Sequence, residues 1–210
     1  MTIGLIVALH TVAQADEIAV SRFDSSESLS GWESKSFKGS TEYRLVKEEG
    51  RTVIKATSTN AASGLIKKIR FSPVTHRYLR WSWKISHTVQ GGDEKTRSGD
   101  DYAARVYVVF HGRFFWQTKA INYIWANRLA KGDSAPNVYT ANAMMIAVES
   151  GNGMAGKWLP EQRDLVADYR LLFGTDPPEA EAIAIMTDTD NTGCSAEAWY
   201  GEILLATESK

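Results

Sequence analysis

The chain has few residues that would cross-link it or give it a strong charge. Cys194 is the only cysteine among 210 residues, so no internal disulfide can form. The 24 Lys and Arg nearly balance the 25 Asp and Glu, and the formal net charge of −1 does not favour nucleic acid or an anionic membrane as a partner. A chain of this length must therefore be stable through its hydrophobic core, and 43% of its residues are hydrophobic.

Long apolar runs are missing as well. The run Ile3–Leu9 is much shorter than the ~20 residues of a membrane-spanning helix, and no other stretch is long enough. It precedes Ala13-Gln14-Ala15, and this order is typical of a signal peptide and its cleavage site, although no Lys or Arg comes before the run. We therefore predict a signal peptide at residues 1–15, a periplasmic or secreted location and no membrane span. The alternative is a buried N-terminal strand.

Common catalytic signatures are also absent. The 4 His are not spaced as a metal pair, and neither a G-x-S-x-G elbow nor a G-x-x-x-x-G-K-[ST] phosphate loop occurs. The E-x-D-x-x-E motif of some sandwich glycanases is missing too. The sequence therefore assigns no catalytic residue.

The sequence instead contains many short segments with the period of two that β-strands show. In Tyr78–Ile85, four apolar residues on one face alternate with polar residues on the other. Strands are predicted at Tyr43–Lys47, Thr52–Thr57, Gly64–Ile69, Tyr78–Ile85, Tyr102–Phe110, Ala120–Ala126, Val138–Val148, Ala182–Met186 and Ala198–Leu205. The first two flank Glu48-Glu49-Gly50-Arg51 and are predicted to form a hairpin, with Gly50 available for a positive φ in the turn. Residues 20–37 are expected to be a loop-rich lead-in, because Ser and Gly separate their apolar residues.

One helix is predicted, at Pro160–Phe173. Pro160 suits a first turn, the apolar residues form one stripe, and Gly174 suits the C-cap. Many short strands and one late helix predict an all-β fold. We expect a single domain at residues 16–210, an antiparallel β-sandwich or jelly roll with one short helix late in the chain.

An acidic loop lies between the last two predicted strands. Asp188 and Asp190 are two residues apart and Gly193 follows, which is a spacing that supplies oxygen ligands to calcium. The helix-loop-helix calcium motif is absent, because its twelfth position is Trp199. The alternative is a structural turn held by hydrogen bonds to its own backbone. A structural calcium at Asp188 and Asp190 is thus the one cofactor we consider.

A second candidate site surrounds Arg105, which shares a predicted strand face with Tyr107. A buried arginine needs a carboxylate partner, since an unpaired buried charge is very costly. Asp101, Asp168 and Asp188 are the candidate partners, and the alternative is a purely structural ion pair. On the helix, Asp168 and Arg170 are expected to help dock it on the sheet.

Aromatic residues are numerous, with 7 Trp and 8 Tyr. Most are expected in the core, but Trp116 and Trp158 lie nearest to loops and are the best candidates for exposed rings that bind sugars. The complete set of predicted ligand-binding residues is Asp101, Arg105, Tyr107, Asp168, Arg170, Asp188, Trp116 and Tyr200.

Several motifs together resemble a bacterial exported domain family of unknown function. They are GDDYAARVYVVF, YIWAN, RDLVADYRLLFG and MTDTDNTG followed by AWYGEI, and the resemblance extends from about Phe23 to Leu204. It implies a jelly-roll sandwich similar to carbohydrate-binding modules and galactose-binding-like domains, and it implies no catalytic residues. Glu202 stands where the family pattern leads us to expect Asp.

We therefore expect a non-catalytic periplasmic ligand-binding or interaction domain, with a carbohydrate or envelope glycan as its partner. One alternative is a hydrolase or lyase that acts on polysaccharide and uses Arg105 with Asp101, Asp168 or Asp188. That alternative predicts that these side chains converge in one concave pocket. A purely structural envelope protein is the third possibility.

Overall fold

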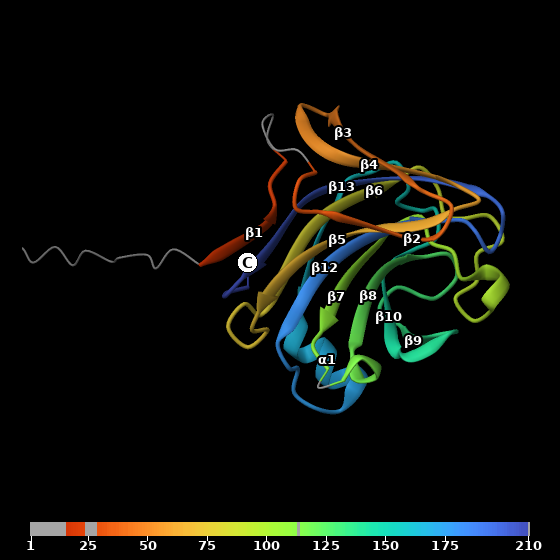
Figure 1. The fold of residues 1–210 in the computed structure, drawn as a ribbon. Coiled ribbons are helices and arrows are strands. Elements are labelled where there is room, and N and C mark those ends of the chain that lie inside the picture. Colours follow the sequence, from red (N-terminus) through yellow and green to blue (C-terminus); the bar gives the residue numbers. More distant parts are fainter. Residues whose placement is uncertain (1–15, 24–28, 113, 210) are drawn as a thin grey trace, which may run out of the picture.

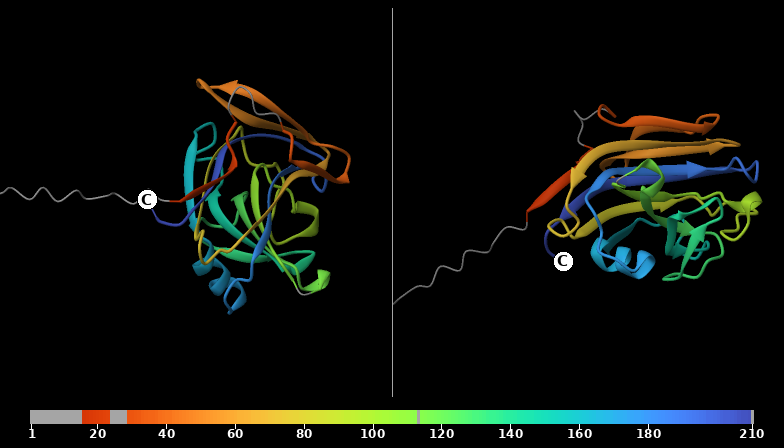
Figure 2. Two further views of the ribbon diagram at one scale, coloured as in Figure 1. Left: turned by 60° about the vertical axis from the view of Figure 1, so that its left-hand side comes forward. Right: turned by 60° about the horizontal axis from the view of Figure 1, so that its bottom comes forward.

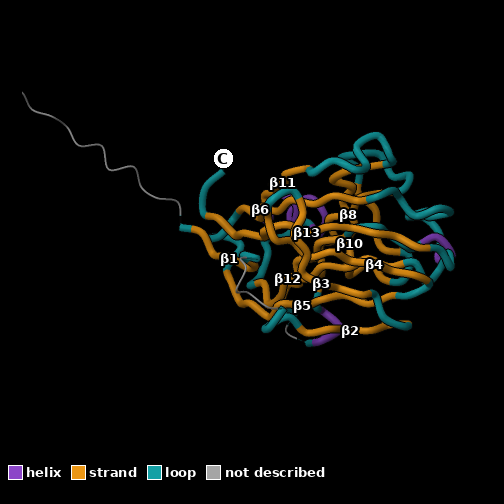
Figure 3. Tube along the Cα trace, turned by 90° about the horizontal axis from the view of Figure 1, so that it is seen from above, coloured by secondary structure: helices purple, strands orange, loops and turns teal. Residues whose placement is uncertain are grey.

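Two β-sheets pack face to face around one main hydrophobic core (Figure 1). The computed structural model describes residues 16–23, 29–112 and 114–209. Seen from above, the strands of the two sheets run along nearly the same direction (Figure 3), as in aligned β-sandwiches. The predicted all-β sandwich is confirmed.

Sheet A has six strands in the order β11-β6-β13-β4-β3, and β1 also pairs with β13. Its strands are β1 (Glu17–Ser21), β3 (Glu42–Glu48), β4 (Arg51–Thr59), β6 (Tyr78–Ile85), β11 (Leu159–Asp164) and β13 (Ser195–Ala206). All its pairings are antiparallel.

Sheet B has seven strands in the order β2-β5-β12-β7-β8-β10-β9. They are β2 (Glu33–Lys38), β5 (Ala62–Phe71), β7 (Arg105–Phe110), β8 (Lys119–Ala126), β9 (Ser134–Asn137), β10 (Thr140–Ser150) and β12 (Ala180–Asp188). The helical elements are η1 (Arg97–Gly99), η2 (Phe115–Gln117) and α1 (Leu165–Phe173). Helix α1 lies at one end of sheet B in all three ribbon views (Figures 1 and 2).

Aromatic side chains of β6 and β8 join the two sheets. The rings of Trp81 and Tyr123 have centroids 5.3 Å apart, and those of Trp83 and Trp125 are 5.8 Å apart. All four side chains are buried, so the apolar face predicted for Tyr78–Ile85 is the core face. Alternation therefore leaves Ser82 on the outer face of sheet A.

The turn between β3 and β4 confirms the predicted hairpin. Glu49 and Gly50 have φ angles of 50° and 81°, and two consecutive positive φ values match the strand twist of a two-residue hairpin. Glu48 pairs with Arg51 directly across this turn. The turn thus fixes where Arg51 enters sheet A.

The helix prediction was wrong at its beginning. Residues 159–164 form strand β11, which pairs with β6, and α1 begins only at Leu165. Pro160 is tolerated there because β11 is an edge strand and needs no second set of hydrogen bonds. Asp164 is the N-cap and accepts hydrogen bonds from the N–H groups of Val166 and Ala167 at 3.1 and 3.0 Å.

Two further expectations on strands were incomplete. The lead-in at residues 20–37 contains part of β1 and all of β2 except its last residue, Lys38. Every residue of β2 is exposed, so its sequence carries no periodic apolar signal. Strands β8 and β10 run parallel, unlike the antiparallel remainder, because β9 forms a hairpin with β10 and lies between the two in the chain. Among the described residues, no helix is long and apolar enough to cross a membrane.

Candidate functional site

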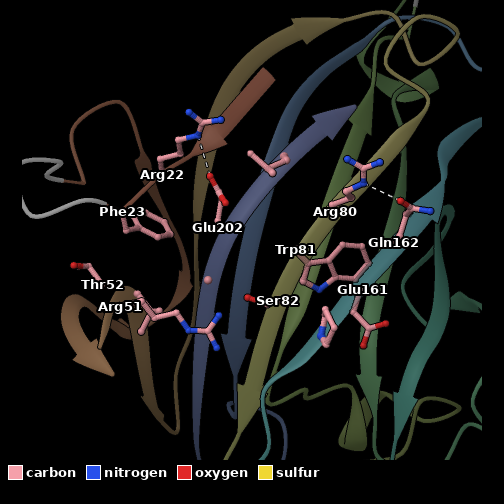
Figure 4. A pocket seen from close by; sticks show the side chains of 14 residues that line it. Arg22, Phe23, Arg51, Thr52, Arg80, Trp81, Ser82, Glu161, Gln162 and Glu202 are labelled. Carbon is pink, nitrogen blue, oxygen red and sulfur yellow. Dashed lines mark hydrogen bonds and ion pairs between the residues drawn. The ribbon is translucent and has the colours of Figure 1, made fainter. Parts of the chain in front are cut away.

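An open groove of about 650 Å³ crosses the outer face of sheet A (Figure 4). Strands β4, β6, β11 and β13 carry most of its lining, and the segment after β1 closes one side. The lining residues are Arg22, Phe23, Arg51, Thr52, Val53, Arg80, Trp81, Ser82, Pro160, Glu161, Gln162, Gly201, Glu202 and Leu204.

The floor of the groove is low because Gly201 has no side chain. A Cβ atom at Gly201 would lie 2.2 Å from Ser82 Oγ and 3.5 Å from the ring of Trp158. Gly201 also sits where the pairing of β13 with β6 shifts register, between Tyr200 and Ile203. Such an irregularity changes the direction of nearby side chains, and here it leaves a gap between the two sides of the groove.

Hydrogen-bonding side chains form the rims. On one rim Arg22 Nε donates to Glu202 Oε1 at 2.9 Å, and both side chains are about half exposed. On the other rim Arg80 donates to Gln162 Oε1 at 2.8 Å and to Glu17 Oε1 at 2.6 Å, and it is buried (Figure 4). The first rim can rearrange around a ligand, whereas the second is fixed.

A row of cations and indole rings continues from the groove along sheet A. The Arg51 guanidinium carbon lies 4.2 Å from the ring centroid of Trp158, and Lys84 Nζ lies 5.5 Å from the same ring. Lys84 Nζ is also 4.6 Å from the ring of Trp199, which Lys55 Nζ approaches to 5.0 Å. We call Arg51, Trp158, Lys84, Trp199 and Lys55 the cation–indole row.

Ion pairs with carboxylates neutralise the two lysines of this row but not its arginine. Lys84 bonds to Glu48, and Lys55 lies 2.5 Å from Glu197. Arg51 has no carboxylate partner among the described residues. Its guanidinium points toward Ser82 over the groove (Figure 4).

Glu161 borders the groove from β11. Its Oε1 accepts a hydrogen bond from Trp83 Nε1 at 3.1 Å. Burial raises the pKa of Glu161 to about 7, the hydrogen bond from Trp83 opposes that rise, and the negative charge of Glu149 adds to it, while Lys131 and Arg163 lower the pKa. The charge of this carboxyl group therefore changes near neutral pH.

Of its predicted partners, Arg105 bonds to Asp188, and Asp101 lies beside Asp188, but all three residues are outside the groove lining. Arg105 Nη2 donates to Asp188 Oδ2, and both residues are buried. Burial raises the pKa of Asp188 to about 7, while the charge of Arg105 opposes the rise. Asp101 accepts hydrogen bonds from the N–H groups of Asn191 and Thr192 and so closes the acidic loop against sheet B.

The two predicted tyrosines surround the same arginine. The Arg105 guanidinium lies 5.5 Å from the ring of Tyr107, and the Arg105 N–H donates to the Tyr200 hydroxyl at 3.3 Å. That hydroxyl donates to the Met186 carbonyl at 2.8 Å. Since Tyr200 belongs to sheet A and Met186 to sheet B, these bonds connect the sheets across the core.

The remaining predicted residues lie elsewhere. Asp168 accepts from Tyr123 at 2.9 Å and from Arg163 Nε at 2.9 Å, so it fastens α1 to both sheets. Arg170 pairs with Asp176 at the surface. Trp116 is 58% exposed and stacks on Phe114 with centroids 4.7 Å apart and planes 6° apart.

None of the eight predicted ligand residues belongs to the described lining of the groove. No pattern in the sequence predicted the three groove arginines, Arg22, Arg51 and Arg80, as site residues. Alternation along Tyr78–Ile85 already assigned Arg80 to the polar face, but no sequence signal connected it with Arg51. Only the pairing of β13 with both β4 and β6 brings these strands side by side.

The fold is that of a β-sandwich of the jelly-roll type with a groove on one outer face. The chain belongs to a family described as "Protein of unknown function (DUF3047)", whose model matches residues 30–204. A comparison with curated proteins found no match.

Several solved structures align with most of this chain, at low identity and low TM-score. A family 30 carbohydrate-binding module aligns at 11% identity with a TM-score of 0.49, over 91% of this chain and 99% of its own. A family 29 carbohydrate-binding module from Piromyces equi aligns at 9% identity with a TM-score of 0.42, over 94% and 93% of the two chains. An exolytic alginate lyase from Zobellia galactanivorans aligns at 9% identity with a TM-score of 0.41, over 87% and 96%. All three TM-scores are below 0.5, and these likenesses identify no ligand.

Proposed function

We propose that this protein is a non-catalytic periplasmic domain that binds a carbohydrate in the groove on sheet A. The groove itself carries the proposal, since its volume of about 650 Å³ is typical of ligand sites and it is open to solvent. Ser82, Gln162 and Glu202 supply the hydroxyl, amide and carboxylate groups that hydrogen-bond to sugar hydroxyls.

A glycan array followed by titration calorimetry tests this proposal. Glu202→Ala removes an exposed rim carboxylate, and we expect the affinity for the bound glycan to fall about fivefold, which corresponds to the loss of roughly one hydrogen bond of ~1 kcal/mol. Trp116→Ala is the control, because Trp116 lies on the η2 segment outside the groove lining. Absence of binding to every glycan on the array would refute the proposal.

The same control tests the predicted role of Trp116. Its exposed ring stacks with Phe114, and flat aromatic surfaces of this kind also bind sugars. If Trp116→Ala abolishes binding while Glu202→Ala leaves the affinity unchanged, the ligand site is the Phe114–Trp116 pair and the groove assignment is wrong.

An enzyme that acts on polysaccharide is the second candidate, and Glu161 is the observation that favours it. A carboxyl group with a pKa of about 7 beside a groove has the property of a general acid at neutral pH. The carboxylates first considered for an enzyme do not converge with Arg105 in one site. Arg105 bonds to Asp188, whereas Asp168 bonds to Tyr123 and Arg163. Release of reducing ends or unsaturated products that Glu161→Gln abolishes would establish catalysis and replace the non-catalytic proposal.

A structural calcium ion at Asp188 and Asp190 stays a proposal. Carboxylate oxygens of Asp101, Asp188 and Asp190 lie within 4.8 Å of one another, which suits a hard cation. The charge of Arg105 on Asp188 acts against it. The test is the melting temperature with calcium and with EDTA, for the native chain and for Asp190→Asn; no calcium-dependent rise in the native chain would remove this proposal.

Export also stays a proposal, because residues 1–15 lie outside the described part of the chain. We propose cleavage after Ala15, which places the mature N-terminus at Asp16, immediately before β1. Cell fractionation together with N-terminal sequencing of the exported protein tests this. A protein that retains Met1 and stays in the cytoplasm would refute it.

A further inference from the structure

We infer that the groove on sheet A selects an acidic glycan, one that carries carboxylate or sulfate groups, and that Arg51 is the residue that binds the anion. This inference rests on the proposed function and adds the class of ligand. Its first support is the state of Arg51, which is exposed and lines the groove without a carboxylate partner among the described residues. A guanidinium group presents a rigid fork of donors that matches an oxyanion in two-point geometry.

The second support is the way in which Trp158 is used. Neutral sugars bind tryptophan by stacking on a bare indole face. Here Arg51 lies over the ring at 4.2 Å, and Lys84 lies 5.5 Å from the ring centre. Trp158 therefore holds a cation in position beside the groove, and a ligand that arrives there meets positive charge before it meets an aromatic face.

The third support is the difference among the three groove arginines. Arg80 is buried and already bonded to Glu17, so it stabilises its rim and is not available to a ligand. Arg22 is bonded to Glu202, but both side chains are about half exposed, and surface pairs of this kind are weak enough to exchange partners. Arg51 offers a charge that no described carboxylate pairs, and Arg22 can add a second one when an anion displaces Glu202.

The local charge contrasts with that of the whole chain. Of the three lining arginines, Arg22 is balanced by Glu202 and Arg80 by Glu17, whereas no described carboxylate balances Arg51. The full sequence, by contrast, has a formal net charge of −1. General attraction of polyanions by the whole protein is therefore not expected. Selectivity for an anion must come from this groove, which makes it testable with single substitutions.

The experiment compares matched charged and neutral polymers by affinity electrophoresis and titration calorimetry at 150 mM salt. The first pair is polygalacturonate and its fully methyl-esterified form, and the second is dextran sulfate and dextran. We expect at least one charged polymer to bind tenfold or more tightly than its neutral partner, and the tighter of the two charged polymers identifies the oxyanion. Arg51→Ala should lose tenfold or more in affinity, and Arg51→Lys should lose less, since it keeps the charge without the fork.

Arg97→Ala is the matched control. Arg97 is also exposed and also lies over an aromatic ring, 5.2 Å from the centroid of Tyr139, but it is outside the groove lining. An equal loss for Arg97→Ala and Arg51→Ala would mean non-specific attraction and would overturn the inference. Equal or tighter binding of the neutral polymers would also overturn it, yet would leave the proposed function standing. If the protein binds none of these polymers and no glycan on the array, both the inference and the proposed function are refuted.

Discussion

The buried pair of Arg105 and Asp188 allows a quantitative test of what holds sheet B to the acidic loop. Both residues are at most 5% exposed, and the Arg105 guanidinium also lies 4.6 Å from the ring of Tyr102. Arg105→Met leaves Asp188 buried without its counter-charge, and breaking such a pair costs about 3–5 kcal/mol. For a chain of this size that is a fall in melting temperature of roughly 10 °C.

A double-mutant cycle completes the test, with the single variant Asp188→Leu and the double variant Arg105→Met, Asp188→Leu. Because the double variant removes both charges, we expect it to be more stable than Arg105→Met alone by about 2 kcal/mol. The assay is urea denaturation of each variant, followed by tryptophan fluorescence. A loss below about 1 kcal/mol for Arg105→Met, or a double variant that is as unstable as the sum of the single variants, would refute the reasoning.

The same variant should respond to pH in a definite direction. Burial raises the pKa of Asp188 to about 7, and Arg105 is the charge that limits the rise. Without Arg105 the folded protein holds this proton more tightly than the unfolded chain does. Binding of this proton to Asp188 stabilises the folded state at acidic pH, and this stabilisation is lost as the pH rises through the folded-state pKa. The deficit of Arg105→Met should therefore be larger at pH 8 than at pH 5.

Three further predictions concern the groove and helix α1. Burial raises the pKa of Glu161 to about 7 in the folded protein, so the stability that this group contributes is complete below its unfolded-state pKa and declines between about pH 4.5 and 7. Glu161→Gln should flatten that decline and raise the free energy of unfolding at pH 8 by about 1–3 kcal/mol, as measured by urea denaturation. Gly201→Ala should cost about 1–3 kcal/mol, since its Cβ would lie 2.2 Å from Ser82 Oγ, and Ser82→Gly should restore most of the loss; an unchanged melting temperature for Gly201→Ala would contradict the described packing. Asp164→Ala should cost about 1–2 kcal/mol through loss of the N-cap of α1, measurable by thermal circular dichroism, whereas no change would mean that this cap is not needed.

Features that depend on neighbouring residues were predictable from the sequence. The alternation in Tyr78–Ile85 placed β6 within its observed bounds, and the Glu49-Gly50 turn placed the β3–β4 hairpin. Gly174 was correctly assigned as the C-cap of the helix, with φ of 70°. Each signal lies within a few residues, because side-chain direction in a strand and a positive φ in a turn are local properties.

Features that depend on pairing partners were not predictable in the same way. Nothing within residues 159–164 distinguishes an edge strand from a first helical turn, and the pairing with β6, about 80 residues earlier in the chain, decides it. The convergence of Arg105 with Asp188 was foreseen as one of three pairings, because a buried arginine needs an acid. Which acid it meets was settled by the pairing of β7 with β12.

The sequence by itself therefore determined the class of fold, the family motifs and the need of Arg105 for a partner. Tertiary structure alone decided the candidate site. Arg51, Ser82 and Glu202 lie far apart in the chain and become neighbours only because β13 pairs with both β4 and β6. The groove forms where the register of β13 with β6 shifts at Gly201. Because this shift depends on two strands that are distant in the chain, neither strand shows it in its own sequence.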